Sequence, residues 1–251
     1  MTQLVALALP GGPDFVSALR RVWDGGDAVF PVDLRLPSNE LARVMEVVAP
    51  TAVIESDGER RTLDGGRPVD PGDAAVIATS GTTGFPKGVV HSRDGLLASA
   101  RATGAALAID PATDRWLACL PLAHIGGFSV VTRSVLTDTP LVVHPEFDPV
   151  DATDAARTGG VTLVSLVTRA LNQIDPAIFR RVLLGGGRPP AYRPPNVLAT
   201  YGLTETASGV VYDRQPLSGV EIRIDDGDEI LLRAPMLLRC YRDATTDELH
   251  S

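Results

Sequence analysis

Residues 74–88 have the sequence AAVIATSGTTGFPKG, in which an apolar run passes directly into glycines, hydroxyl side chains and one lysine. The apolar run over 74–79 has the length and composition of a buried strand. In the segment 80–88, glycines allow tight turns that point backbone N–H groups inward, while hydroxyl groups and the Lys87 ammonium add donors and positive charge. This composition suits a phosphate group, although a flexible surface loop rich in glycine and threonine would have the same composition.

The segment is not a Walker A loop. That motif requires a glycine and then a lysine at the fifth and sixth positions after its first glycine. The fifth residue after Gly81 is Pro86. Any phosphate contacts here would therefore follow a different pattern.

Away from this segment, short apolar runs alternate with longer amphipathic stretches, which predicts an α/β fold with mainly parallel sheets and flanking helices. From about Pro216 the pattern changes, because 220–224 and 229–233 alternate like the two strands of a hairpin. We expect an α/β core over residues 1–215 and the start of a small β subdomain over residues 216–251. The predicted strands are 4–9, 28–32, 52–54, 74–79, 115–120, 141–143, 161–165 and 181–184, and the predicted helices are 14–23, 38–48, 93–108, 126–137, 149–158 and 168–174.

Composition excludes several classes of protein. The formal net charge of −8 argues against a nucleic-acid surface as the main partner. No apolar run approaches the ~18 residues that a membrane span requires, and the apolar stretch 4–9 lacks the basic leader of a signal peptide. Cys119 and Cys240 have neither zinc nor redox spacing, so we expect two buried thiols in a reducing cytoplasm. Whether the chain forms a homo-oligomer stays open.

Three ordered motifs carry a resemblance to the adenylate-forming superfamily, which includes acyl- and aryl-CoA synthetases, luciferases and the adenylation domains of peptide synthetases. Residues 80–88 resemble its phosphate-loop signature S-G-T-T-G-x-P-K-G, and residues 201–205, YGLTE, resemble its signature Y-G-x-T-E. Residues 227–235, GDEILLRAP, resemble G-E-I-x-x-R-G-P. The third motif departs from the family pattern at Asp228, Ala234 and Cys240.

The resemblance implies that ATP activates a carboxylic acid as an acyl-adenylate, which then forms a thioester with CoA. It implies that Tyr201 lies beside adenine, that Thr204 donates to the α-phosphate, and that Glu205 binds Mg²⁺. Taken alone, Tyr201 would more often be a core aromatic and Glu205 a solvated carboxylate. The nucleotide-binding residues that the resemblance implies are Ser80, Gly81, Thr82, Thr83, Gly84 and Lys87 of the phosphate loop, Gly185, Gly186 and Gly187 of a glycine-rich turn, and Tyr201, Gly202 and Thr204.

The acid site is expected near residues 120–128, LPLAHIGGF, where a strand ends and a helix begins. The stretch resembles the family pattern P-x-x-H-x-x-G, which implies that His124 lies beside the substrate carboxylate and that Gly127 belongs to the acid pocket. Taken alone, His124 would more often be a capping or core histidine. No aspartate starts this helix as in relatives that activate amino acids, so an amino acid is a poor candidate substrate.

Arg133 stands in an otherwise apolar helix, where burying an unpaired guanidinium would be costly. It could reach solvent or pair with a structural carboxylate, or it could face a second anionic group of the substrate. The strings around Arg133, 164–167 and 200–208 resemble the o-succinylbenzoate–CoA ligase branch, a branch of menaquinone biosynthesis whose substrate has a second carboxylate. Two alternatives remain, namely another aryl- or acyl-CoA ligase and a non-catalytic module that binds nucleotide or acyl-adenylate.

In the family, a string like 241–251 is followed by a G-W-x-x-T-G-D segment, whose aspartate binds ribose, and by a C-terminal domain of ~100 residues. That domain carries the lysine that stabilises the adenylation transition state. We therefore expect these 251 residues to be a core without its mobile lid, which binds nucleotide but turns over slowly.

Overall fold

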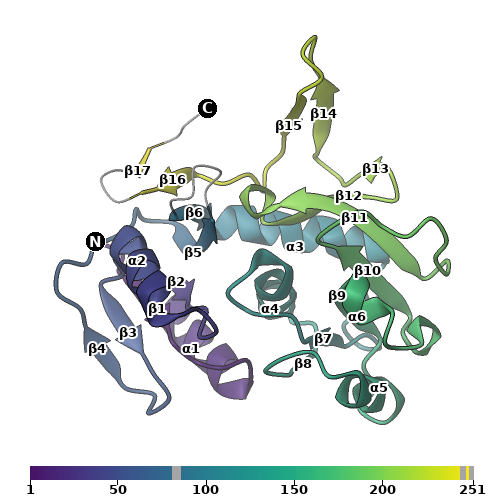
Figure 1. Cartoon of the computed structure of the whole chain (residues 1–251), viewed down its shortest axis with the longest axis horizontal. Helices are drawn as coiled ribbons and strands as arrows, with labels where there is room; N and C mark the ends of the chain where they lie inside the picture. The colour runs from purple at the N-terminus through teal and green to yellow at the C-terminus, as the bar shows by residue number, and fades with distance from the viewer. Residues whose placement is uncertain (81–85, 244–246, 249–251) are drawn as a thin grey trace.

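The structure is a computed structural model that describes residues 1–80, 86–243 and 247–248. Two large twisted sheets lie side by side with helices between and around them (Figure 1). The first sheet has the strand order β17-β16-β6-β5-β2-β1-β3-β4, and the second has the order β13-β12-β11-β10-β9-β7-β8. Both sheets are parallel at their centres, so the predicted α/β fold class is confirmed.

The strands of the first sheet are β1 (Leu4–Leu7), β2 (Ala28–Pro31), β3 (Ala52–Ile54), β4 (Arg60–Thr62), β5 (Asp73–Ser80), β6 (Pro86–Ser92), β16 (Cys240–Arg242) and β17 (Asp247–Glu248). The strands of the second sheet are β7 (Trp116–Ala118), β8 (Leu141–Val143), β9 (Leu163–Val167), β10 (Arg181–Gly185), β11 (Val197–Leu203), β12 (Ser208–Tyr212) and β13 (Gln215–Pro216). A separate hairpin consists of β14 (Glu221–Ile224) and β15 (Ile230–Arg233), and it projects from the body in Figure 1. The helices are α1 (Pro13–Asp24), α2 (Ser38–Val48), α3 (Arg93–Leu107), α4 (Ile125–Thr137), α5 (Pro149–Arg157) and α6 (Thr168–Leu171), with 3-10 turns η1 (Pro176–Ile178) and η2 (Thr204–Thr206).

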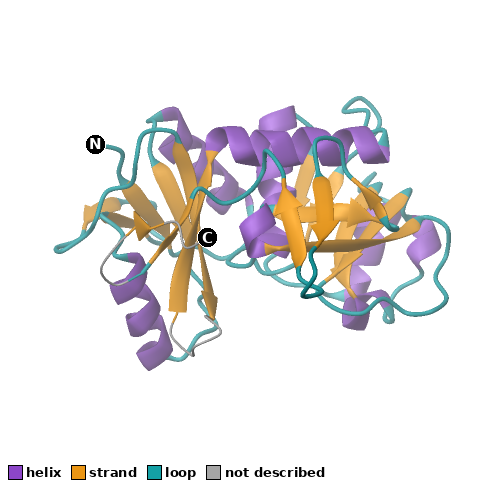
Figure 2. Ribbon diagram, turned by 90° about the horizontal axis from the view of Figure 1, so that it is seen from above, coloured by secondary structure: helices purple, strands orange, loops and turns teal. Residues whose placement is uncertain are grey.

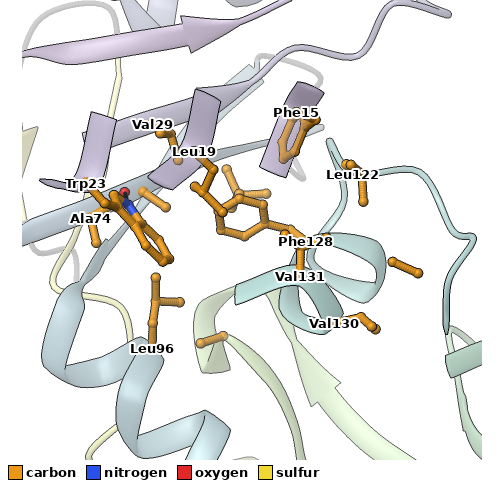
Figure 3. Packing of buried hydrophobic residues seen from close by; sticks show 14 of the residues in the cluster. Phe15, Leu19, Trp23, Val29, Ala74, Leu96, Leu122, Phe128, Val130 and Val131 are labelled. Atoms are coloured by element: carbon orange, nitrogen blue, oxygen red, sulfur yellow. Dashed lines mark hydrogen bonds between the residues drawn. The ribbon is translucent and has the colours of Figure 1, made fainter. Parts of the chain in front are cut away.

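Three helices, α1, α3 and α4, form an apolar layer between the two sheets. Phe15 and Leu19 of α1 point toward Phe128 of α4, and Leu96 of α3 approaches the same cluster (Figure 3). Helix α2 covers the outer face of the first sheet, while α5 and α6 cover the outer face of the second. Because both faces of each sheet are covered, the central strands are continuous apolar runs.

Strand β16 is fixed to the first sheet by two arginines. Arg239 donates from Nε and Nη2 to the buried carboxylate of Asp73, over 2.7 and 2.8 Å. Arg242 is fully buried and donates to the carbonyl oxygen of Val48, at the end of α2, over 2.7 Å. Because β16 also pairs with β6, these contacts hold Tyr241 beside the strand that carries Lys87.

Several boundaries differ from the sequence-based expectation. Strands β6, β11 and β12 were not expected, because their glycines and polar residues obscure a strand pattern at the antiparallel edges of the sheets. The expected strand 115–120 is shorter, and the expected helix 168–174 ends at Leu171. Both cysteines are buried as expected. The division of the chain at residue 216 stays a prediction.

Among the residues that the structure describes, no helix combines the length and the apolar composition needed to cross a membrane. The apolar helix α4 has 13 residues and packs in the core between the sheets. Figure 2 shows helices lying between the two groups of strands.

The layer between the sheets should dominate stability. Leu19→Ala removes a fully buried side chain from it and should lower the free energy of unfolding by about 2–5 kcal/mol. Leu231→Ala is the matched control, because Leu231 is 40% exposed on the projecting hairpin and should cost about 0.5 kcal/mol or less. Urea unfolding followed by tryptophan fluorescence would measure both variants, and equal losses would contradict the assignment.

Candidate active site

A lysine from the first sheet meets a glutamate from the second. The Nζ atom of Lys87, on β6, lies 3.6 Å from Oε1 of Glu205, on η2. The same Nζ lies 3.6 Å from the centre of the Tyr241 ring, and the Tyr241 hydroxyl donates to Glu205 Oε1 over 3.0 Å. Burial raises the pKa of Tyr241, the neighbouring Lys87 lowers it, and Glu205 raises it again. Lys87 is the only lysine in the sequence, so this positive charge has no lysine substitute.

The turn that carries Thr204 and Glu205 is held by the side chain of Thr206. The Leu203 N–H donates to the Thr206 hydroxyl over 2.8 Å, and that hydroxyl donates in turn to the Ser208 carbonyl over 2.7 Å. A Cβ at Gly202 would lie 2.2 Å from the Ser208 carbonyl oxygen, so only glycine allows β11 and β12 to approach this closely. The turn therefore presents Glu205 in one orientation.

The first of two cavities, here called the inner cavity, has a volume of about 420 Å³. It lies at the carboxyl ends of four neighbouring parallel strands, β7, β9, β10 and β11, where open α/β sheets usually bind ligands. The start of α4 forms another wall, and the positive end of a helix dipole favours an anion there. Of the predicted site residues, His124, Gly127, Gly185, Gly186, Gly202 and Thr204 line this cavity.

Gly127 is required by packing. A Cβ at this position would lie 2.4 Å from the carbonyl oxygens of both Leu120 and Pro121. Any larger residue would push α4 away from the loop that follows β7. Gly127 thus sets how closely the helix start approaches the cavity.

The second cavity, here called the outer cavity, has a volume of about 690 Å³ and lies where β2 and β5 of the first sheet end. His124 and Thr204 line both cavities, so they form the wall between them. Nε2 of His124 lies 2.9 Å from Nη2 of Arg35 and 3.5 Å from Oδ2 of Asp33. Arg35 holds the pKa of Asp33 below its ordinary value.

Arg133 lies behind the inner cavity, in the interior. Its Nη2 donates to the Ser208 hydroxyl over 2.9 Å, and its guanidinium lies over the Trp116 ring at 4.9 Å. Ser208 lines the inner cavity, but Arg133 itself does not. Within the described part of the chain, Nε and Nη1 of Arg133 have no hydrogen-bond partner and no carboxylate pairs with this charge. Burial lowers the pKa of Arg133, as expected for a desolvated cation.

His91 is buried beneath the turn that carries Thr204. Neither of its ring nitrogens forms a hydrogen bond that satisfies ordinary geometry among the described residues. Burial lowers the pKa of His91 to about 4, and the neighbouring Thr204 main chain and Glu205 charge only partly oppose this. The imidazole is therefore neutral at pH 7.

The remaining predicted site residues either lie outside the described part of the chain or do not line the inner cavity. Gly81, Thr82, Thr83 and Gly84 lie outside the described residues, and Ser80 ends strand β5. Tyr201 is 40% exposed and, like Gly187, does not line the inner cavity.

Asp33, Arg35 and Ser208 were missed as site residues, and Tyr241 was recognised only as part of a motif. No local pattern marks Asp33 and Arg35, because both contact a residue far along the chain, and the contact of Arg35 with His124 spans 89 positions.

Beside Lys87, the carboxylate of Glu205 is the group suited to bind a metal ion. The described residues contain no group of three or more His, Cys, Asp or Glu side chains arranged to hold a metal. Glu205 alone fits a magnesium ion whose other ligands are phosphate oxygens and water, the usual arrangement for this cation.

A comparison with family models and a comparison with curated proteins indicate the same family. Residues 55–241 match the sequence model of a family described as AMP-binding enzyme. A 2-succinylbenzoate–CoA ligase of Geobacillus kaustophilus is 31% identical over 245 residues, which cover 82% of this chain and 49% of that protein. The chain spans about half the length of the curated relatives that it matches.

Two solved structures of o-succinylbenzoate coenzyme A synthetase (MenE) from Bacillus subtilis are similar in fold. The complex with AMP has a TM-score of 0.81 and 25% identity, and the match covers 96% of this chain and 77% of that one. The complex with ATP and magnesium ion has a TM-score of 0.81 and 24% identity, over 96% of this chain and 62% of that one.

The neutral, buried His91 should make the fold sensitive to acid. Its pKa is about 4 in the folded chain and about 6.5 when unfolded, so the unfolded state takes up a proton first as the pH falls. The stability that this residue contributes is present above about pH 6.5 and lost by about pH 4. When the pH falls from about 7.5 to about 4.5, the unfolding free energy of both proteins should drop. The drop should be about 2–3 kcal/mol smaller in His91→Met than in the wild type. Urea unfolding at both pH values tests this, and identical losses would show that His91 is not the source.

Proposed function

The chain belongs to the family of AMP-binding enzymes, and on that premise we propose that it acts as an acid–thiol ligase, which activates a carboxylic acid with ATP and transfers the acyl group to coenzyme A. The observation that carries the proposal is the contact of Lys87 on β6 with Glu205 on η2, next to Thr204, which lines both cavities. The proteins it resembles are CoA ligases, and the similar B. subtilis synthetase has been solved with AMP and with ATP and magnesium ion.

In the proposed reaction, the acid's carboxylate attacks the α-phosphorus of ATP in line with the departing pyrophosphate. The thiol of CoA then attacks the acyl-adenylate and releases AMP. The protein mainly positions the reactants and compensates charge. We assign the β- and γ-phosphates to Lys87 and to the hydroxyls of Ser80, Thr82 and Thr83. Thr204 is assigned to the α-phosphate and Tyr201 to the adenine ring. The glycines assigned to a close approach of the backbone to the nucleotide are Gly81 and Gly84 of the phosphate loop and Gly185, Gly186, Gly187 and Gly202.

Glu205 is assigned to magnesium. The ion supplies positive charge that offsets the phosphate oxygens when it is bound. In the present structure Lys87 lies next to Glu205, so the triphosphate would draw the ammonium away and leave the carboxylate available. The assignment of Lys87 to the phosphates and that of Glu205 to magnesium both depend on the Lys87–Glu205 contact.

The acid is assigned to the inner cavity, whose volume is within the usual range for small-molecule sites. The start of α4, with Gly127 and His124, would face the reacting carboxylate. Arg133 supports an acid of the o-succinylbenzoate type, because a buried guanidinium without a carboxylate partner favours a second anionic group nearby. This assignment places the chain in menaquinone biosynthesis, in the cytoplasm where the buried thiols Cys119 and Cys240 stay reduced.

The single lysine makes the nucleotide site testable by chemical labelling. An amine-reactive acetylating reagent can modify only the Nζ of Lys87 and the α-amino group of Met1. ATP with Mg²⁺, present at about ten times its Kd, should slow acetylation of Lys87 about tenfold, because only the free fraction reacts. AMP lacks the β- and γ-phosphates and should protect less, while the fully exposed Met1 is the internal control. Equal protection by AMP and ATP, read by mass spectrometry, would argue against Lys87 as the ligand of these phosphates.

Substitution of Arg133 should affect substrate recognition without lowering stability. Arg133→Met should weaken binding of o-succinylbenzoate by about 1.5–3 kcal/mol, the scale of a hydrogen bond to a charged group, and should spare benzoate. Replacing a buried charge without a counter-ion by an apolar side chain should leave the fold equally stable or more stable. Calorimetry and urea unfolding give the two readouts, with the exposed Arg101→Met as control. Equal losses for the two acids, or a less stable fold, would make Arg133 structural.

A further inference from the structure

The loop that follows β2 holds an acidic and a basic side chain in a fixed arrangement. Nε and Nη2 of Arg35 donate to the two carboxylate oxygens of Asp33 over 2.8 and 2.7 Å. The Arg35 backbone N–H also donates to Asp33, over 3.1 Å. The Asp33 side chain is only 12% exposed, so this paired contact orients the guanidinium although Arg35 itself reaches solvent.

The oriented guanidinium determines which nitrogen of His124 carries the proton. Nη2 of Arg35 lies 2.9 Å from Nε2 of His124, a hydrogen-bond distance. A guanidinium has only donors, so Nε2 must accept, and the proton of a neutral imidazole is then on Nδ1. Oδ2 of Asp33 lies 3.5 Å from Nε2, which is longer than an ordinary N–H···O bond. The arginine therefore outweighs the carboxylate at this nitrogen.

We propose that Asp33 and Arg35 are positioning residues that hold His124 in its neutral, Nδ1-protonated form, so that Nδ1–H can donate to the carboxylate of the acid. The role of the donor rests on the proposed function, in which the inner cavity holds the acid. The tautomer itself rests only on the three side chains.

The surroundings of His124 support this assignment. His124 forms part of the wall between the two cavities, and Asp33 lines only the outer one. Within the described chain, Nδ1 of His124 makes no hydrogen bond, so its proton is available to a ligand. Burial lowers the pKa of His124, Asp33 raises it, and Arg35 lowers it again, with a net shift below the ordinary value. Glu40 and Arg43 of α2 are the other charged residues that line the outer cavity.

A neutral donor suits the proposed chemistry better than a cation would. The carboxylate must attack the α-phosphorus as a nucleophile, and a neutral N–H orients it without removing its charge. An imidazolium would bind the ground-state carboxylate more tightly and would have to release it as the attack proceeds, which gains nothing in rate. Keeping His124 neutral thus favours the transition state over the bound acid.

Nitrogen NMR measures the tautomer directly. The chain has four histidines, and ¹⁵N-histidine labelling with long-range proton correlation distinguishes a protonated from an unprotonated ring nitrogen. His124→Gln assigns the signal. At mildly alkaline pH the wild type should show His124 protonated at Nδ1. In Arg35→Met, Asp33 is the remaining group facing Nε2, so the proton should move to Nε2.

Arg43→Met is the matched control, because Arg43 is an exposed arginine that lines the outer cavity, as Asp33 and His124 do, without a contact to His124. This variant should keep the wild-type tautomer. An Nε2-protonated His124 in the wild type would overturn the proposal, and so would an unchanged tautomer in Arg35→Met. These spectra need no substrate, so they stand even if the proposed reaction is wrong.

Binding of o-succinylbenzoate in the presence of AMP tests the second half of the proposal. Arg35→Met should weaken it about two- to tenfold, the effect of one misplaced neutral hydrogen bond, and Arg43→Met should not. Unchanged affinity together with a shifted tautomer would overturn the donor role. Failure of the wild type to bind the acid at all would overturn the proposed function and leave the tautomer result intact.

Discussion

The apolar layer formed by α1, α3 and α4 sets the distance between the two sheets, and the contacts of the candidate site that join the sheets depend on that distance. Phe15 and Leu19 on one side and Phe128 on the other are almost fully buried. A close-packed layer of this kind neither compresses nor expands at low cost. It therefore fixes the separation at which a lysine on β6 and a glutamate on η2 meet, although their strands share no backbone hydrogen bond.

Helix α4 of this layer also contributes to the positive potential that the proposed anionic substrates would require. With a net charge of −8, the chain has to concentrate positive potential locally. It does so with one lysine between the sheets, with the start of α4 at the inner cavity, and with Arg133 inside the fold. Burying Arg133 beside only a hydroxyl and an indole ring costs free energy, and a low-dielectric setting makes its field stronger than that of a surface charge. Such a cost is understandable at a ligand site and hard to explain in an ordinary core.

The parts of the site that could be predicted from the sequence are those encoded by local order. The parallel core followed from alternating apolar runs, and Lys87, His124 and Glu205 each stand in a short motif with the right neighbours. Strand β6 was missed because Gly88 and the adjoining loop motif obscure the alternation of apolar residues that marks a strand. The glycine has a packing reason, since a Cβ at Gly88 would lie 2.7 Å from a Val76 methyl group. Asp33 and Arg35 could not be predicted, since the string VDLRLP contains no recognisable motif and the role of the two side chains depends on their packing against His124.

The two sheets contribute to the site in different ways, which accounts for the division of labour proposed between phosphate and acid. The inner cavity lies at the carboxyl ends of parallel strands, of which β7, β9 and β10 have a parallel neighbour on both sides. Lys87 and Glu205 instead lie on antiparallel edges, β5–β6 and β11–β12, whose short connections bring a motif and its return strand together. The shape of the proposed acid pocket is therefore set by the packed parallel strands, by Ser208, which lines it, and by Arg133, which lies behind Ser208. The strands that present Lys87 and Glu205 are more constrained, because a Cβ at Gly202 would meet the Ser208 backbone and a Cβ at Gly88 would meet the Val76 side chain.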